Sequence, residues 1–216
     1  MKFIRIGILA VQGAYIEHEI SFNKLNISSE FQIICLQIRQ ANQLTNDIDG
    51  LIIPGGESTT LAKFLEIDKF DKVFNSWIED RKKLNKPFMV WGVCAGLILL
   101  SNRIDGQKES GQWKLSGLDI ECERNANGRQ RESSERIVRF NSNSDIYDSN
   151  FPDFLGIFIR SPKITKILGS DVEILAQDIN DEVVAVRQNR FMATTFHPEL
   201  SDDTRWHKFF IKMLLE

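Results

Sequence analysis

A cysteine between two glycines is the residue of this chain best suited to nucleophilic chemistry. Cys94 stands in the pentapeptide Gly-Val-Cys-Ala-Gly, after an apolar run that begins at Pro87 and before an apolar helical pattern. This arrangement predicts a buried strand that turns sharply into a helix, with the sulfur exposed at the turn. Backbone N–H groups at the start of that helix would stabilise a thiolate and a developing oxyanion. The pentapeptide alone also allows a buried, inert thiol.

A histidine and a glutamate two residues apart could complete a thiol site. His197 and Glu199 follow an apolar strand pattern at residues 191–196. In extended backbone alternate residues share a face, so the carboxylate could orient the imidazole and stabilise its charged form. Together with a cysteine, such a pair provides a nucleophile, a proton shuttle and an orienting group, whereas a purely structural histidine is the alternative. For His18 and His207, which lie in predicted helices, we expect surface or helix-packing roles.

A glycine-rich loop is the second candidate for ligand binding. It runs from Pro54 to Thr60 with the sequence Pro-Gly-Gly-Glu-Ser-Thr-Thr, after a predicted strand. Two adjacent glycines let the backbone approach a ligand closely and aim N–H groups at it. The loop lacks the Gly-Lys-Ser/Thr ending of a phosphate-binding loop. A plain turn followed by a helix cap from Ser58 or Thr59 is the alternative.

The elements that must position these residues alternate between strands and helices. Helical patterns cover residues 14–25, a segment from about 59, residues 70–84, a segment after Cys94, and residues 203–214. Strand patterns cover residues 3–11, 31–38, 50–53, 87–94, 115–122, 137–140, 156–159, 172–176, 183–187 and 191–196. The alternation predicts an α/β fold with a mostly parallel central sheet, which the closely spaced later strands extend in antiparallel fashion. Residues 141–150 are predicted to form a surface loop, either exposed to solvent or in contact with a partner.

Length and composition narrow the class of protein. The 216 residues fit one domain, and the net charge of −3 gives no electrostatic reason to expect binding to nucleic acid or to a membrane. The three cysteines are widely spaced and odd in number, and no Cys/His cluster has the spacing of metal ligands. The apolar N-terminus is interpreted as a core strand, not a signal peptide. We therefore expect a soluble, cytoplasmic protein.

Six motifs together resemble those of one family. They are Gln12-Gly13, Pro54 to Thr60, Gly92 to Gly96, Arg124-Asn125 with Gly128 to Gln130, Phe158 to Arg160, and His197 to Leu200. In these motifs the chain is similar to the glutaminase subunits of pyridoxal 5′-phosphate synthase, a branch of the class I (triad-type) glutamine amidotransferases. The resemblance implies a single-domain, three-layer, flavodoxin-like sandwich that hydrolyses L-glutamine to glutamate and ammonia without a cofactor or metal.

The resemblance also implies a role for each motif residue. It makes Cys94 the nucleophile, with His197 and Glu199 completing the triad. Substrate binding would fall to Gly56, Glu57, Ser58, Arg124, Ile159 and Arg160. The oxyanion hole would involve Gln12, Gly13, Gly55 and Ala95. The ammonia would pass to a synthase subunit, a separate chain in a hetero-oligomer.

The sequence departs from the family pattern at two positions, and three other functions remain alternatives. Val93 stands where threonine is common, and Asn127 where an aromatic residue is usual, but neither change removes a catalytic atom. One rival is a glutaminase that serves another pathway, such as imidazole glycerol phosphate synthesis. A second is a non-catalytic binding module that regulates a partner, and a third is a cysteine peptidase on a similar scaffold.

Overall fold

The computed structural model describes residues 2–26, 31–105, 113–124, 133–151 and 153–216. Its helices are α1 (Tyr15–Leu25), α2 (Ser58–Ile67), α3 (Phe70–Lys83), α4 (Ala95–Leu100) and α5 (Arg205–Leu215), with short 3-10 helices η1 (Ala41–Gln43) and η2 (Pro198–Leu200). The strands of the main sheet are β1 (Lys2–Leu9), β2 (Phe31–Ile38), β3 (Gly50–Ile53), β4 (Met89–Val93), β7 (Ser134–Phe140), β8 (Asp153–Phe158), β10 (Glu173–Asp178), β11 (Val183–Gln188) and β12 (Phe191–Thr194). None of the described helices is long and apolar enough to cross a membrane.

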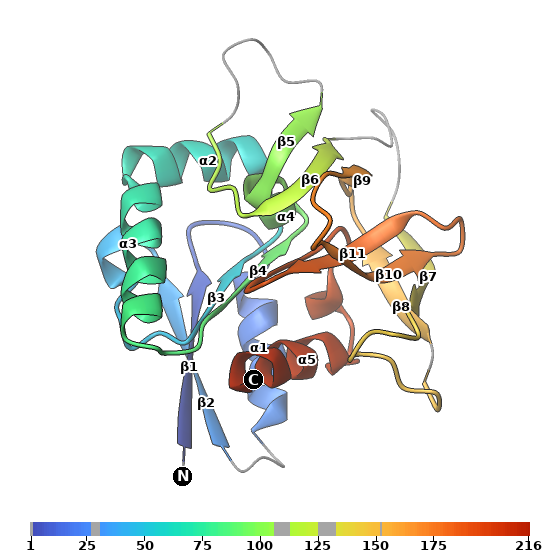
Figure 1. Ribbon diagram of the computed structural model, residues 1–216, viewed down its shortest axis with the longest axis horizontal. Coiled ribbons are helices and arrows are strands. Elements are labelled where there is room, and N and C mark those ends of the chain that lie inside the picture. Colours follow the sequence, from blue (N-terminus) through green and yellow to red (C-terminus); the bar gives the residue numbers. More distant parts are fainter. Residues whose placement is uncertain (1, 27–30, 106–112, 125–132, 152) are drawn as a thin grey trace.

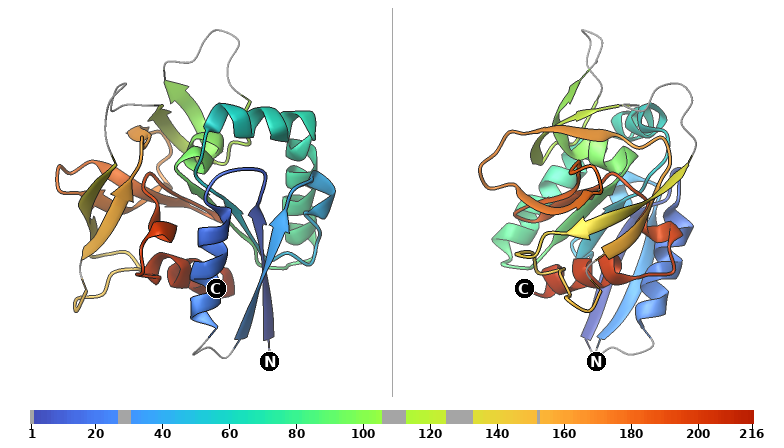
Figure 2. Two further views of the ribbon diagram at one scale, coloured as in Figure 1. Left: turned by 180° about the vertical axis from the view of Figure 1, so that it is seen from behind. Right: turned by 90° about the vertical axis from the view of Figure 1, so that its right-hand side faces the viewer.

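Within the described residues, nine strands form one sheet in the order β2-β1-β3-β4-β12-β11-β10-β7-β8 (Figure 1). Each neighbouring pair from β2 to β12 is parallel. Each pair from β12 to β8 is antiparallel. The predicted parallel sheet with an antiparallel extension is therefore confirmed. Figure 2 shows β7 and β8 on the side of the molecule opposite α3.

Side chains of the parallel strands alternate between two hydrophobic cores, one on each face of the sheet. In β4, Trp91 and Val93 join the core that also holds residues of α1 and α5. Val90, which precedes Trp91 and lies on the opposite face of the sheet, joins the core formed with α2, α3 and α4. Figure 1 shows β3 and β4 between these two groups of helices. The protein therefore has the three layers that the sequence predicts.

A second, three-stranded sheet differs from the predicted arrangement. It contains β5 (Ser101–Asp105), β6 (Leu118–Glu123) and β9 (Lys163–Ile167), in that order. Of these, the sequence predicts only the central strand, β6. The edge strands β5 and β9 bury few residues, chiefly Ile104 and Ile164, so neither carries a strong apolar pattern. The predicted surface loop at 141–150 consists of mostly exposed turns, although Ile146 is buried in the core that also holds residues of α1 and α5.

The parallel strands determine where a site can form. β1, β3, β4 and β12 all run in the same direction, so the segments that follow them meet at one edge of the sheet. Gln12, Gly55, Cys94 and His197 lie in those four segments. Ligands of open α/β sheets commonly bind outside the carboxyl ends of the strands. The parallel topology therefore brings these four motifs together.

Candidate active site

Cys94 occupies a strained turn between β4 and α4. Its backbone has φ 49° and ψ −99°, a conformation that few non-glycine residues adopt. The Cys94 N–H donates a hydrogen bond to the Thr194 carbonyl of β12 at 2.8 Å, which fixes the turn to the sheet. A Cβ atom on Gly96 would lie 2.0 Å from the Ile53 carbonyl oxygen, so only glycine lets α4 pack this close to β3. The predicted strand-to-helix elbow is confirmed.

His197 and Glu199 form a short, buried polar pair. Their Nδ1 and Oε1 atoms are 2.7 Å apart, and both residues are buried. The side-by-side placement expected for extended backbone does not apply, because Pro198 opens η2 directly after His197. Proline has a φ suited to the first position of a helix, and the resulting tight turn still brings the carboxylate to the ring. The His197 N–H donates to the Ile157 carbonyl at 2.8 Å, which anchors the turn to β8.

The imidazole of His197 is held in its charged form. Burial lowers its pKa, but hydrogen bonds to Cys94 and Glu199 and the charges of both groups outweigh burial and raise the pKa to about 10. An imidazolium can pair with a thiolate and can donate a proton to a leaving amine. Gly55 lies against both groups, since a Cβ atom there would be 2.3 Å from His197 Cε1 and 3.3 Å from Cys94 Cβ.

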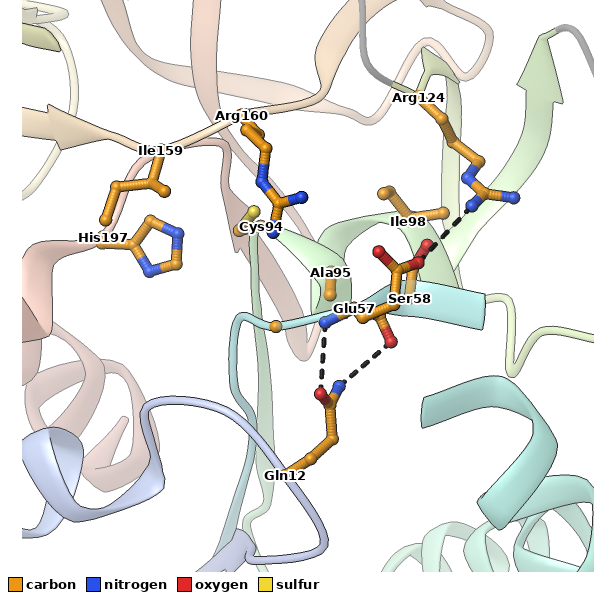
Figure 3. Close-up of a pocket in the computed structure, with 11 residues that line it drawn as sticks. Gln12, Glu57, Ser58, Cys94, Ala95, Ile98, Arg124, Ile159, Arg160 and His197 are labelled. Atoms are coloured by element: carbon orange, nitrogen blue, oxygen red, sulfur yellow. Dashed lines mark hydrogen bonds and ion pairs between the residues drawn. The ribbon is translucent and has the colours of Figure 1, made fainter. Parts of the chain in front are cut away.

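A cavity of about 340 Å³ opens in front of Cys94 and His197 (Figure 3). Its volume lies in the range of small-molecule sites, roughly 300 to 1,000 Å³. Ten of the thirteen residues proposed from the sequence line it, together with Ile98; the lining comprises Gln12, Gly56, Glu57, Ser58, Cys94, Ala95, Ile98, Arg124, Ile159, Arg160 and His197. Sequence reasoning missed Ile98, whose only signal is its position one helical turn after Cys94.

The three remaining proposed residues lie behind the lining. Glu199 is buried behind the His197 ring. Gly13 has φ 88° and packs against Gly55, because a Cβ atom on Gly13 would lie 1.8 Å from the Gly55 carbonyl oxygen. All thirteen residues therefore form one continuous site. Among the described residues, no group of three or more His, Cys, Asp or Glu side chains could hold a metal ion.

Gln12 joins two of the loops that form the cavity. Its Nε2 donates to the Glu57 carbonyl at 3.0 Å, and its Oε1 accepts from the Glu57 N–H at 3.2 Å (Figure 3). Both polar groups of the Gln12 side chain are thereby used to hold the glycine-rich loop. Gly56, with φ 149°, lets the loop turn immediately before this contact. The two loops are thus positioned relative to each other by a pair of hydrogen bonds.

The polar end of the cavity carries charges of both signs. Arg124 donates to Thr59 Oγ1 at 2.7 Å and lies 3.8 Å from Glu57 Oε1. The Glu57 carboxylate also accepts from the Thr59 N–H at 3.2 Å and so caps α2. Arg160 is exposed and has a positive φ of 44°. The rest of the Arg-Asn-x-x-Gly-Arg-Gln motif, including the unusual Asn127, lies outside the described residues.

Comparison with known proteins identifies the family. The model of the SNO glutamine amidotransferase family matches residues 8–216. The chain belongs to this family. It is 38% identical to the pyridoxal 5′-phosphate synthase subunit PdxT of Brevibacillus brevis, over 99% of this chain and 98% of that protein. It is also 38% identical to a probable pyridoxal 5′-phosphate synthase subunit, PDX2, of Arabidopsis thaliana, over 98% of this chain and 86% of that protein.

A solved structure supports the same family. The crystal structure of a glutamine amidotransferase superposes with a TM-score of 0.79 at 34% sequence identity, and the match covers 98% of this chain and 99% of that one. The predicted class I amidotransferase fold is therefore confirmed for this family member.

Two further histidines of this amidotransferase, His18 and His207, are buried, and we expect them to make the folded state less stable in acid. Burial is the largest cause that lowers the pKa of His18 and His207, in each case to about 3. In the unfolded chain a histidine titrates near pH 6.5, so below that pH the unfolded state binds more protons than the folded state. Both residues therefore contribute their full stability above about pH 6.5 and lose it as the pH falls toward 3.

The variant His207→Gln tests whether stability falls with pH in the expected direction. Removing one of the two buried histidines should make the free energy of unfolding depend less on pH. Between pH 6 and pH 4, we expect the slope of this free energy against pH to fall by about 1.4 kcal/mol per pH unit, the value for one proton taken up on unfolding. Urea unfolding of wild type and variant at several pH values in this interval measures the two slopes. Parallel slopes would show that His207 does not take up a proton on unfolding.

Proposed function

We propose that residues 1–216 act as one glutaminase domain that hydrolyses L-glutamine and supplies ammonia to a pyridoxal 5′-phosphate synthase subunit. The observation that carries this proposal is the common cavity of Cys94 and His197, with Glu199 bonded to the far side of the ring. Family membership supports the reaction, and the names of the relatives support the pathway. The proposed reaction has two halves, thioester formation on Cys94 and its hydrolysis.

The first half of the reaction forms a thioester. The Cys94 thiolate attacks the side-chain carbonyl carbon of glutamine and pushes the carbonyl electrons onto oxygen. Backbone N–H groups of Ala95 and of the Gly55-Gly56 loop hold this oxyanion, with the Gln12-Gly13 segment supporting the loop. His197 gives its proton to the leaving nitrogen, and ammonia departs as the carbon–nitrogen bond breaks.

The second half restores the enzyme. Neutral His197 takes a proton from water, and the resulting hydroxide attacks the γ-glutamyl thioester on Cys94. The carbon–sulfur bond breaks, glutamate leaves, and the thiolate pairs again with the imidazolium. Throughout both halves, Glu199 keeps the proton of His197 on Nδ1, so that Nε2 faces the reacting atoms.

Charges around the cavity suit a free amino acid as the substrate. L-glutamine carries an α-carboxylate and an α-ammonium group besides its reactive amide. The Arg160 guanidinium is exposed at the cavity and suits the carboxylate, whereas the Glu57 carboxylate, on the opposite loop, suits the ammonium. Gly56, Ser58, Arg124 and Ile159 complete the proposed substrate site. A glutamine residue within a peptide would lack one or both of these charged groups.

Glutamate and ammonia release from L-glutamine tests the proposed function. We expect release by the wild-type chain, and faster release when its cognate pyridoxal 5′-phosphate synthase subunit is added, because ammonia is useful only beside an acceptor enzyme. The cyclase subunit of imidazole glycerol phosphate synthase serves as the matched control and should give no stimulation. Absence of release from a folded chain that binds the synthase subunit would contradict the glutaminase. Glutamate release that is stimulated by the cyclase subunit and not by the synthase subunit would contradict the proposed pathway.

A further inference from the structure

Two histidines that the proposed mechanism does not use lie behind the triad. His18 of α1 and His207 of α5 are both fully buried, and their Nδ1 and Nε2 atoms, respectively, are 3.0 Å apart. On its other side, His18 Nε2 is 3.6 Å from Glu199 Oε2, the carboxylate oxygen that does not contact His197. The side chains of His197, Glu199, His18 and His207 thus form one buried polar row, which begins at the cavity.

The proton positions in this row follow from charge. The pKa of His18 and of His207 is lowered to about 3, so each ring is neutral and carries a single N–H. A lone pair on His18 Nε2 would face the negative carboxylate of Glu199, so the favourable tautomer has its proton on Nε2. His18 Nδ1 then accepts a hydrogen bond from His207 Nε2–H. The single N–H groups of His18 and of His207 therefore both point toward Glu199.

The contact between His18 Nε2 and Glu199 Oε2 joins two buried polar atoms that each require a polar partner. Neither His18 Nε2 nor Glu199 Oε2 has a hydrogen-bond partner among the described residues, although both are inaccessible to solvent. At 3.6 Å the pair is an electrostatic contact slightly longer than a hydrogen bond.

Aromatic rings fix the orientation of both histidines. Trp91 of β4 meets the His18 ring edge to face at 5.5 Å between centroids and the His207 ring at 5.0 Å. Phe22 packs edge to face on His207 at 4.8 Å. Because such packed rings cannot rotate freely, the N–H of His18 is directed toward Glu199 before substrate arrives.

We propose that His18, oriented by His207, is a positioning residue that holds the Glu199 carboxylate against His197. This inference rests on the proposed glutaminase function, since its effect is exerted through the triad. His18 touches neither the cavity nor the substrate, so its loss should lower kcat and leave KM nearly unchanged. The described structure brings it to the triad through helix packing, 181 positions away from Glu199 in the sequence.

Three variants test the role of His18 in L-glutamine hydrolysis. His18→Leu removes the donor, and we expect kcat to fall about tenfold, as for other groups that orient an active-site residue, with KM changed less than twofold. His18→Gln offers an amide N–H near the position of Nε2 and should recover most of kcat. Phe22→Leu is the matched control, because it loosens the same aromatic packing without removing a polar contact to Glu199.

The outcomes separate this inference from the proposed function. A wild-type chain that does not hydrolyse glutamine would overturn the proposed function. A wild-type chain that does, with equal kcat values for His18→Leu and Phe22→Leu, would overturn only the role of His18. Nitrogen-15 NMR of the histidine-labelled wild type gives a test that needs no variant to fold, since the chain has only three histidines. We expect His18 protonated at Nε2, and protonation at Nδ1 would overturn the inference.

Discussion

Replacing Cys94 with alanine will abolish glutamine hydrolysis while leaving the protein folded. Alanine cannot form the thioester, and the loss of a nucleophile from a catalytic triad commonly lowers kcat by about 10⁴-fold or more. Alanine keeps the small volume that the turn after β4 requires. The measurement is glutamate release by wild type and Cys94→Ala at equal concentration, with circular dichroism to confirm the fold.

Cys35 provides the matched control for this prediction. Burial and the nearby Glu19 raise the pKa of the Cys35 thiol to about 12, and burial raises that of Cys122 to about 11. Both therefore stay protonated and poorly nucleophilic at neutral pH. Cys35→Ala should keep the wild-type rate, because Cys35 lies in β2, away from the cavity lining. Hydrolysis that survived in Cys94→Ala would contradict the proposed nucleophile.

Replacing Glu199 with glutamine will lower kcat by about 10² to 10⁴-fold, because the neutral amide disturbs the proton positions of the buried row. If the amide oxygen faces His197, the amide N–H groups meet the N–H of His18. If the amide is turned the other way, it donates to His197 Nδ1 and forces the His197 proton onto Nε2. The first arrangement sets two donors against each other, and the second opposes the tautomer that the mechanism needs. The loss of the negative charge also lowers the pKa of His197 from about 10.

Steady-state kinetics of Glu199→Gln over a range of pH measures this effect. The substitution keeps the size of the side chain, so a large loss of kcat in a folded variant would reflect charge and proton position. Glu57→Gln is the matched control, because Glu57 is an exposed carboxylate at the substrate end of the cavity. We expect Glu57→Gln to act mainly on KM. A kcat for Glu199→Gln within a few-fold of wild type would contradict the orienting role of Glu199.

The main elements of the fold could be predicted from local patterns. β2 and β3 have the predicted boundaries, because dense apolar runs bounded by polar turns leave little choice. The strand, elbow and helix around Cys94 were likewise predictable from the apolar run and its two glycines. The edge strands β5 and β9 were not, because an edge strand with one well-buried apolar residue looks like a loop. η2 was missed because strand alternation was continued past Thr194, although Pro198 favours a helix start.

The site could be predicted to the extent that its residues lie in motifs. The resemblance supplied every residue that lines the cavity except Ile98, and parallel topology explains why four of the distant motifs meet. His18 carried no comparable signal. A histidine in an amphipathic helix most often packs or faces solvent, and its contact with Glu199 exists only because α1, α5 and η2 pack together. Long-range contacts between single residues of this kind leave no periodic pattern in one sequence.

Covalent capture by an electrophilic analogue of L-glutamine tests whether Cys94 is the nucleophile of a glutamine site. Such an analogue, with a diazoketone in place of the amide, should place one adduct on each wild-type chain, and peptide mass spectrometry should locate it on Cys94. Excess L-glutamine should slow the labelling, and Cys94→Ala should remain unlabelled. An adduct on Cys35 or Cys122, or labelling that glutamine does not slow, would contradict a glutamine site built around Cys94, His197 and Glu199.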